Sequence, residues 1–188
     1  MKFKKRTIVI LIIMILIIIL FPLKGWEKIL KMIYPIKYEN SVEKYSKEYN
    51  VDKYLIYATI KAESNFNNEA VSSKEAKGLM QLMKNTAKDI SKKLDMTLTD
   101  EEIEQKLLEP EFNIQLGTKY ISSLIEKYNS VELALVAYNA GSGSVDNWIE
   151  QGLLKKDGSN IENVPYKETN NYVRKILNDY KVYTNLYN

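Results

Sequence analysis

The chain has 188 residues, enough for one domain with a sizeable core, and a formal net charge of +3. It contains no cysteine and no histidine, which excludes disulfides, Ser-His-Asp or Cys-His catalysis and the common zinc sites, and leaves carboxylates, lysines and tyrosines to move protons. Four of the 27 basic residues precede residue 7 and the other 23 nearly balance 24 acidic ones, so the basic footprint of a nucleic-acid-binding domain is missing and no nucleic acid is expected as a partner.

The first predicted element is an apolar helix that crosses a membrane. Residues 8–23 are an uncharged run of aliphatic side chains, Phe and one Pro, and the predicted anchor, residues 7–24, is at the short end of a spanning helix. The basic tail, residues 1–6, precedes it, so the positive-inside rule keeps this tail in the cytoplasm and places the rest of the chain outside. Residues 21–26 lack a small-x-small cleavage site, which favours an uncleaved anchor over a signal peptide.

Residues 25–38 are predicted to form an amphipathic juxtamembrane linker. Its apolar residues recur at helical spacing before Pro35, and Trp26 suits the outer membrane interface. The apolar positions are Trp26, Ile29, Leu30, Ile33 and Tyr34. Such a segment either lies on the membrane or packs on the domain, and both arrangements are open at this point.

Residues 39–188 are predicted to form a single, mainly α domain, because no convincing alternating strand and no internal repeat is present. Asn40 and Glu43 fit a capping-box start for its first helix. Asp52 is a good N-cap for a second helix that runs to Glu63. After it, the sequence predicts a polar loop over residues 67–78 and a helix over residues 86–94. Thr99 and Glu102 fit a capping box, and Pro110 suits the first turn of a longer helix. Another helix is predicted to begin at Ser130 and end at Gly141, followed by a short helix between Ser144 and Gly152, a loop over residues 153–164 and a last helix from Glu168.

Glu63 is the first candidate for chemistry. Steps of four and three relate Ile56, Ile60 and Glu63, so the carboxyl group lies on an inward-facing apolar stripe. Partial burial and the negative end of the helix dipole both disfavour the carboxylate and raise its pKa. A glutamic acid that stays protonated near neutral pH is what general-acid cleavage of a glycosidic bond requires. By itself the pattern is weak, because a Glu near a helix end is usually a solvated surface residue.

Further short motifs follow Glu63 in the chain. They are Glu63-Ser64, Gly78-Leu79-Met80-Gln81, Ala137-Tyr138-Asn139-Ala140-Gly141 and, near the end, Pro165-Tyr166-Lys167-Glu168-Thr169-Asn170-Asn171-Tyr172-Val173. With these motifs, residues 38–183 resemble the soluble lytic transglycosylase family. Four motifs in the family's order and approximate spacing make the resemblance specific. It implies a lysozyme-like (goose-type, SLT) single domain, here preceded by one transmembrane helix.

The resemblance assigns roles around the acid. Glu63 matches the family's single catalytic acid/base, and Tyr172 matches the tyrosine that holds the catalytic carboxyl group in position. Ser64 matches a neighbour that hydrogen-bonds near the scissile sugar. Taken without the family, Tyr172 at helical spacing favours the core, and Ser64 favours an ordinary helix end.

The other motif residues match the family's glycan contacts. Residues 78–81 correspond to a glycan-lining loop in which Gly78 permits close backbone approach and Met80 offers an apolar contact. Leu79 belongs to the same loop, and Gln81 can both donate and accept hydrogen bonds. The Tyr138 ring would support a sugar and the Asn139 amide would bond an acetamido group. Plain core packing is an equal alternative for Met80.

The resemblance also implies a reaction on peptidoglycan strands. One Glu would protonate the glycosidic oxygen between N-acetylmuramic acid and N-acetylglucosamine, while the substrate's N-acetyl group stabilises the oxocarbenium-like centre. The resulting carboxylate would take the proton of the muramic acid 6-hydroxyl as that oxygen attacks C1, which leaves a 1,6-anhydro end and consumes no water. No metal or organic cofactor is implied, and a monomer is expected.

Two other functions stay open. A goose-type lysozyme-like hydrolase of the same bond needs a second carboxylate, for which Glu69, Glu75 and Asp89 are candidates, although each is more often a solvated surface charge. A non-catalytic, membrane-tethered glycan-binding module needs no acid, so Glu63 together with Tyr172 argues against it. One departure from the family is Lys77, which stands where small or apolar residues are frequent and which could change the shape of the cleft.

The anchor and the motifs together predict a location. We expect a single-pass protein of the cell membrane with a cytoplasmic N-terminus and a catalytic domain outside, facing the cell wall. The composition, rich in Ile, Lys and Asn, and an anchor without a lipid-modified cysteine favour a Gram-positive source.

Overall fold

The computed structural model describes residues 2–20 and 23–188, with side chains described for residues 5–13, 15 and 25–188. Within this part of the chain the regular structure is helical apart from two isolated bridges, which pair Val71 with Lys77 and Lys77 with Leu82. The prediction of a mainly α domain is therefore confirmed. The helices are α1 (Lys2–Leu20), α2 (Leu23–Ile33), α3 (Glu39–Tyr49), α4 (Lys53–Ser64), α5 (Lys84–Lys93), α6 (Asp100–Lys106), α7 (Pro110–Tyr128), α8 (Val131–Ala140), α9 (Ser142–Glu150), the 3₁₀ turn η1 (Ile161–Asn163) and α10 (Lys167–Tyr187).

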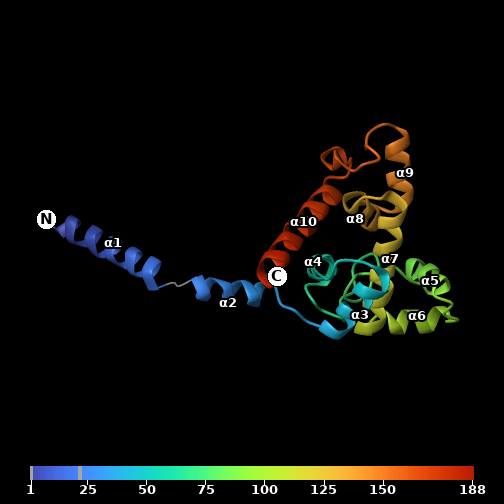
Figure 1. Ribbon diagram of the computed structural model, residues 1–188, viewed down its shortest axis with the longest axis horizontal. Helices are drawn as coiled ribbons and strands as arrows, with labels where there is room; N and C mark the ends of the chain where they lie inside the picture. The colour runs from blue at the N-terminus through green and yellow to red at the C-terminus, as the bar shows by residue number, and fades with distance from the viewer. Residues whose placement is uncertain (1, 21–22) are drawn as a thin grey trace.

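The N-terminal helix α1 extends away from the packed helices (Figure 1). Its described apolar side chains are each about half exposed. No helix within the described residues combines the length and the apolar character that a bilayer crossing requires. The predicted anchor, residues 7–24, lies partly outside the described residues, because residues 21–22 and the side chains of residues 14 and 16–24 are not included.

The predicted linker, residues 25–38, is a helix followed by a short extended stretch that lies against α10. The Tyr34 hydroxyl donates to Asp179 Oδ1 (3.0 Å), and the Tyr183 hydroxyl donates to the Pro35 carbonyl (3.2 Å). The Tyr187 hydroxyl donates to the Tyr34 carbonyl (2.7 Å). The end of the linker is therefore fixed to the C-terminal half of α10 and packs on the domain.

The central helix of the domain is α4, which packs against α10 on one side and α3 on another (Figure 1). Every residue from Tyr54 to Ile60 is buried, so the helix is enclosed around most of its circumference. The Asp52 carboxylate accepts from the Tyr54 N–H (2.7 Å), which confirms the predicted N-cap. The chain leaves α4 at Asn65 in the left-handed conformation (φ 49°).

The predicted capping box of Asn40 and Glu43 is wrong. Helix α3 begins at Glu39, after Tyr38 in the left-handed conformation (φ 57°), and no side chain caps it. The Asn40 side chain therefore lies inside the first turn, where it cannot reach the N–H groups that an N-cap serves. The predicted apolar face of Val42, Tyr45 and Tyr49 is confirmed, since all three are buried.

Helices α5, α6 and α7 form the second side of the domain (Figure 1). Thr99 and Glu102 form the predicted capping box of α6, with reciprocal bonds of 3.2 and 2.8 Å. Pro110 occupies the first turn of α7, as predicted. A small second core fills the space between these helices and consists of Leu82, Ala87, Ile90, Ile103, Leu107 and Leu116.

The last helices bring the ends of the domain together. Ser130 caps α8 by accepting from the Leu133 N–H (3.2 Å), and Gly141 (φ 86°) ends it, both as predicted. Helix α10 then runs back along α4 and α8. Three of the four motifs predicted to carry chemistry therefore lie on neighbouring helices, because they belong to α4, α8 and α10.

The two capping interpretations give a matched pair of stability tests. We expect Asp52→Ala to lower the free energy of unfolding by about 1 kcal/mol, because a buried helix loses the acceptor for one of its first N–H groups. Asn40→Ala should leave that free energy unchanged within about 0.5 kcal/mol, since Asn40 caps nothing. Urea unfolding of the full chain in detergent, followed by circular dichroism, measures both. An equal loss from both substitutions would contradict the assignment of the caps.

Candidate active site

Glu63 is the penultimate residue of α4, and its half-buried side chain faces α10. The Tyr172 hydroxyl, on α10, donates to Glu63 Oε1 at 2.5 Å. Burial raises the pKa of Glu63 to about 7, and the bond from Tyr172 and the charge of Lys175 act in the opposite direction. The predicted raised pKa is confirmed, with burial as its main cause. Near neutral pH the carboxyl group is therefore present in both its acid and its base form.

The chain after Glu63 fixes the end of α4 in place. The Asn65 N–H donates to the Lys61 carbonyl (3.2 Å), and Phe66, also in the left-handed conformation, is buried with its ring 6.5 Å from that of Tyr57. The Lys175 ammonium donates to the Ala62 carbonyl (3.4 Å). A cation on the last carbonyls of a helix also interacts favourably with its dipole. The position of the Glu63 carboxyl group is thus determined from both sides of the helix end.

Tyr138 is the third group that converges on this point. Its hydroxyl donates to the Met80 carbonyl (2.7 Å), and its ring packs on that of Tyr120 at 5.1 Å. Burial, followed by the charge of Glu63, holds the pKa values of Tyr138 and Tyr172 well above their usual range. Both phenols therefore stay neutral hydrogen-bond donors beside the carboxyl group.

The loop over residues 78–81 carries the largest correction to the predicted contacts. The side chains of Leu79 and Met80 have no exposed surface, so they face the core and do not present an apolar contact to a ligand. For Met80 this confirms the alternative of plain core packing. Both N–H groups of the Gln81 amide serve the loop itself, donating to the carbonyls of Ala70 (3.0 Å) and Gly78 (2.9 Å). Met80 contributes to the site through its backbone, because its carbonyl receives Tyr138.

Gly78 also serves the protein interior. It adopts φ 77°, and a Cβ atom at this position would lie 2.2 Å from the Leu107 carbonyl oxygen and 2.3 Å from the Asn113 amide nitrogen. Both contacts are impossible for a larger residue. The close backbone approach predicted here is present, and its partners are the Leu107 carbonyl at the end of α6 and the Asn113 side chain of α7.

Asn113, to which the sequence analysis gave no role, holds the loop against α7. Its side chain is fully buried and accepts from the Met80 N–H (2.7 Å). It donates to the carbonyls of Lys77 (2.9 Å) and Leu107 (2.8 Å). Gly117, one turn later, leaves room for the Met80 sulfur, which would lie 2.4 Å from a Cβ atom there. The sequence did contain a signal for this role, because the Asn113 amide stands between the apolar residues Phe112 and Ile114 in a helix that was predicted to pack on the core.

Ser64 and Asn139 lie at the ends of α4 and α8. The Ser64 hydroxyl donates to the Ile60 carbonyl (3.2 Å), a bond inside its own helix. Asn139 is exposed, and its Oδ1 accepts from the buried Thr169 hydroxyl (2.8 Å). Thr169, in the first turn of α10, was also missed by the sequence analysis. It fixes Asn139 relative to the helix that carries Tyr172.

The remaining candidates lie on the surface. Glu69, Glu75 and Asp89 are exposed, and within the described residues no hydrogen bond joins any of them to Glu63 or its tyrosines. Lys77 turns toward α6 and pairs with Glu104 (3.4 Å) beside a charged cavity of about 250 Å³. The departure noted at Lys77 therefore affects this side cavity, whose lining includes both residues.

Comparisons with known proteins agree with this geometry. The model of the family described as Transglycosylase SLT domain matches residues 40–160. A soluble lytic murein transglycosylase of Salmonella typhimurium is 31% identical over 156 residues, which is 82% of this chain and 24% of that protein. A membrane-bound lytic murein transglycosylase C of Edwardsiella ictaluri is 40% identical over 118 residues, 58% of this chain and 32% of that protein.

Solved structures show the same relationship. An inactive mutant of the lytic transglycosylase Slt from Pseudomonas aeruginosa superposes with a TM-score of 0.73 at 33% identity, covering 84% of this chain and 25% of that one. The 70 kDa soluble lytic transglycosylase of Escherichia coli gives a TM-score of 0.75 at 27% identity, covering 83% and 25%. The chain thus spans about a quarter of the length of these relatives.

The role of Asn113 can be tested by stability. We expect Asn113→Ala to lower the free energy of unfolding by about 3 kcal/mol, because it leaves the Met80 N–H and the Leu107 carbonyl without their partner and removes one of the two donors to the Lys77 carbonyl. On the same helix, Gln115→Ala should cost less than about 1 kcal/mol, because its amide makes a single bond of 3.3 Å to the Tyr49 hydroxyl. Chemical unfolding measures both variants, and similar losses would show that Asn113 does not hold the loop.

Proposed function

The chain belongs to the transglycosylase SLT domain family, and from this membership we propose that it is a peptidoglycan lytic transglycosylase with Glu63 as its single acid/base. The observation that carries the proposal is the half-buried Glu63, with a pKa of about 7 and a hydrogen bond from Tyr172. The bond cleaved would be the β-1,4 bond between N-acetylmuramic acid and N-acetylglucosamine. The products would carry 1,6-anhydro-N-acetylmuramic acid ends.

The geometry suits one carboxyl group that acts twice. Because Oε1 accepts from Tyr172, Oε2 is the more basic oxygen and carries the proton of the acid form. This proton passes to the glycosidic oxygen as its bond to C1 breaks, with the substrate's own N-acetyl group stabilising the positive centre. The carboxylate then takes the proton of the 6-hydroxyl as that oxygen bonds to C1. The carboxyl group is thereby returned to its acid form, and no water is consumed.

The surrounding residues have supporting roles in this proposal. Tyr172 holds Glu63 and stabilises its carboxylate between the two steps. The partly exposed Tyr138 ring and the exposed Asn139 amide contact the sugars. Residues 78–81 shape the cleft by positioning Tyr138 through the Met80 carbonyl. Ser64 lies beside the acid at the helix end.

The hydrolase alternative receives less support. A water-activating or nucleophilic carboxylate would have to stand within about 5 to 10 Å of the acid. The three candidates for that role are exposed, and within the described residues no hydrogen bond joins any of them to the acid or to its tyrosines. A pure binding module would have no use for an acid whose pKa is raised by burial.

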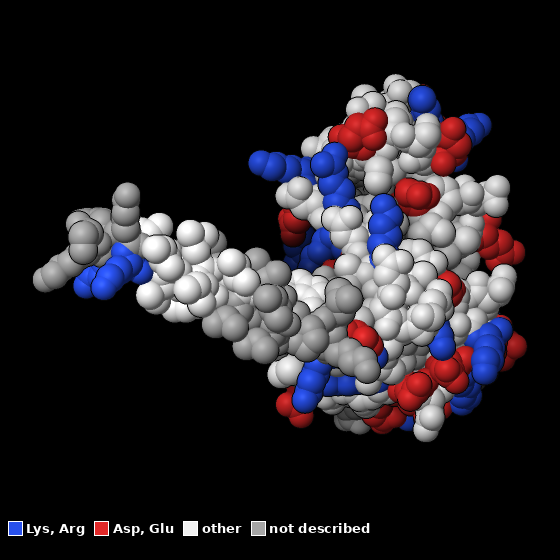
Figure 2. Space-filling model, turned by 60° about the vertical axis from the view of Figure 1, so that its left-hand side comes forward, with Lys and Arg blue, Asp and Glu red and all other residues white. Residues whose placement is uncertain are grey.

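For the location we propose that residues 7–24 anchor the chain in the cell membrane. Residues 1–6 would then be cytoplasmic, and residues 39–188, the catalytic domain, would face the cell wall. The cations before the apolar run support this orientation. Figure 2 shows both signs of charge interspersed over the visible face of the domain, which suits a domain in aqueous surroundings.

Product analysis tests the proposed activity. Purified peptidoglycan digested with the full chain should release 1,6-anhydro-muropeptides, identified by mass spectrometry. Glu63→Gln should lower their release at least about a thousandfold, because an amide has no proton to give. Glu69→Gln serves as the matched control and should retain wild-type activity. Reducing ends without anhydro products would overturn the lyase reaction in favour of a hydrolase, and equal release by Glu63→Gln would overturn the role of the acid.

The pH dependence tests the pair of Glu63 and Tyr172. Because the first step needs the acid form, kcat/KM should fall as the pH rises through about 7. Tyr172→Phe removes a bond that lowers the pKa of Glu63, so the fall should move to higher pH while the maximal rate drops. Rates of anhydro-product release across a pH series measure both effects. A fall that moves to lower pH in Tyr172→Phe would contradict the assigned pair.

A further inference from the structure

We propose that α2 is a membrane-surface helix and that its junction with α10 holds the catalytic domain in a fixed orientation close to the bilayer. This proposal rests on the membrane anchor proposed above and adds to it a second lipid contact and a rigid connection. It therefore assigns a partner, a lipid surface, to an apolar helix face that the domain leaves uncovered.

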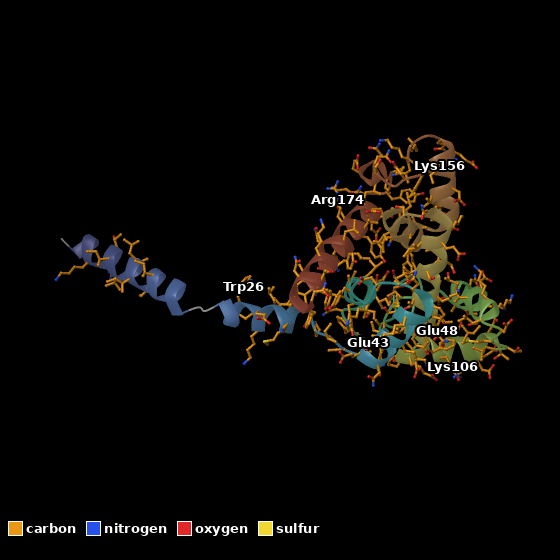
Figure 3. All side chains as sticks on the ribbon, viewed as in Figure 1. Trp26, Glu43, Glu48, Lys106, Lys156 and Arg174 are labelled. Carbon is orange, nitrogen blue, oxygen red and sulfur yellow. The ribbon has the colours of Figure 1, made fainter. Side chains whose placement is uncertain are left out.

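Helix α2 has one apolar face that no part of the described domain covers. Trp26 is 57% exposed, Met32 76% and Ile33 50%, and Ile29 is also exposed. At 100° per residue these four side chains form one side of the helix. Figure 3 shows α2, with Trp26, standing outside the packed helices. A tryptophan and three aliphatic side chains on one exposed face mark an interaction surface.

The opposite side of α2 faces the domain. Lys31 lies 5.5 Å from the centre of the Tyr187 ring on α10 and pairs with Glu27 (2.6 Å). The helix geometry places Lys31 about 140° to 160° around the axis from Trp26 and Ile29. The apolar face is therefore directed away from α10, so folding of the domain does not bury it.

The position of α2 in the chain favours lipid as the occupant. Leu23, the first residue of α2, follows the last residue of α1 by three positions, a reach of about 10 Å. If α1 is the anchor, the first turn of α2 must lie at the bilayer surface. Tryptophan is enriched at that depth, and Lys28, beside the apolar face, can extend toward anionic headgroups. A partner protein would have to compete with the lipid for the apolar face of α2, because the anchor keeps that helix at the bilayer surface.

The junction between α2 and the domain is a set of partly buried contacts. Tyr34 donates to the buried Asp179 (3.0 Å), and its ring meets that of Tyr183 edge to face at 5.4 Å. Tyr183 and Tyr187 donate to the carbonyls of Pro35 and Tyr34. The Lys61 ammonium of α4 lies 4.7 Å from the centre of the Tyr34 ring. Because Tyr34 and Pro35 are held by these contacts, the connection between α2 and the domain is not a flexible tether.

The junction limits how far the acid lies from the membrane. Tyr172 and Tyr187 belong to the same helix and are 15 residues apart, about 22 Å along its axis. Glu63 contacts Tyr172, so the acid stands within about 20 to 25 Å of the junction. The enzyme would therefore act on the glycan strands nearest the bilayer.

Trp26 reports on the lipid contact. We would reconstitute the full chain into vesicles of phosphatidylcholine and phosphatidylglycerol and subtract the fluorescence of Trp26→Phe, in which the buried Trp148 is the remaining tryptophan. The Trp26 signal should be quenched several-fold more by lipids brominated high on the acyl chain than by aqueous iodide. Quenching by iodide alone would overturn the proposal, and shielding from both quenchers would overturn it in favour of a protein contact.

Two controls separate this proposal from those it rests on. Retention of the chain in vesicles after alkaline carbonate extraction tests the anchor, so an extracted chain would fail that proposal first. A retained chain whose Trp26 stays in water would fail this one alone. Release of anhydro-muropeptides from soluble glycan should be the same for Trp26→Phe and wild type, because Trp26 lies far from the acid in the chain and outside the packed domain.

The fixed orientation can be measured with single cysteines, because the natural chain has none. Lys106 and Lys156 lie at opposite ends of the domain (Figure 3). In a fixed orientation the fluorophores on Lys106→Cys and Lys156→Cys each keep one distance from the bilayer, which sets their energy transfer to acceptor lipids. A flexible Gly-Ser insert between residues 33 and 34 frees the domain and should change these efficiencies. Efficiencies that the insertion leaves unchanged for both fluorophores would overturn the rigid junction.

Discussion

The hydrogen bond from Tyr172 to Glu63 is the interaction on which the site depends. It joins the end of α4 to α10, and it acts against the burial that surrounds it. Burial alone would favour the neutral acid, whereas a donated hydrogen bond and the nearby Lys175 favour the carboxylate. Their balance leaves the pKa near 7, where one group can give a proton in one step and accept one in the next. Removing either influence would favour one form and weaken the other half of the proposed cycle.

The loop beside this pair is held in place by hydrogen bonds to the protein interior. Asn113 bonds to one carbonyl and one N–H of the loop from residue 77 to residue 80, and it also donates to the Leu107 carbonyl. Gly78 and Gly117 allow α7 to approach that loop, and the Met80 carbonyl in turn receives Tyr138. The predicted glycan-lining residues are thus connected to the site through two layers of packing. Their side chains determine where the loop lies, and in the proposed function the partly exposed Tyr138 and the exposed Asn139 contact the sugar.

How much the sequence predicts depends on how local the cause is. The Asp52 cap, the box of Thr99 with Glu102 and the stop at Gly141 were confirmed, because each involves atoms within a few residues. The raised pKa of Glu63 followed from an apolar stripe on one helix. The box at Asn40 failed because Tyr38 takes a left-handed conformation as the linker meets α10, a contact across the chain. The roles of Asn113 and Thr169 were missed for the same reason, since their partners are set by tertiary packing.

Helix α10 connects the chemistry to the proposed membrane surface. Steps of four, three and four relate Tyr172, Ile176, Asp179 and Tyr183, so the partner of the acid and the partners of the linker lie on one stripe of the same helix. Such a stripe packs as a unit, because its central residues are buried against α4 and its neighbours. A shift of α10 along α4 would therefore change the bond to Glu63 and the contacts to Tyr34 together. It follows that a force applied to the domain through the linker is carried by the helix that holds the Glu63 carboxyl group.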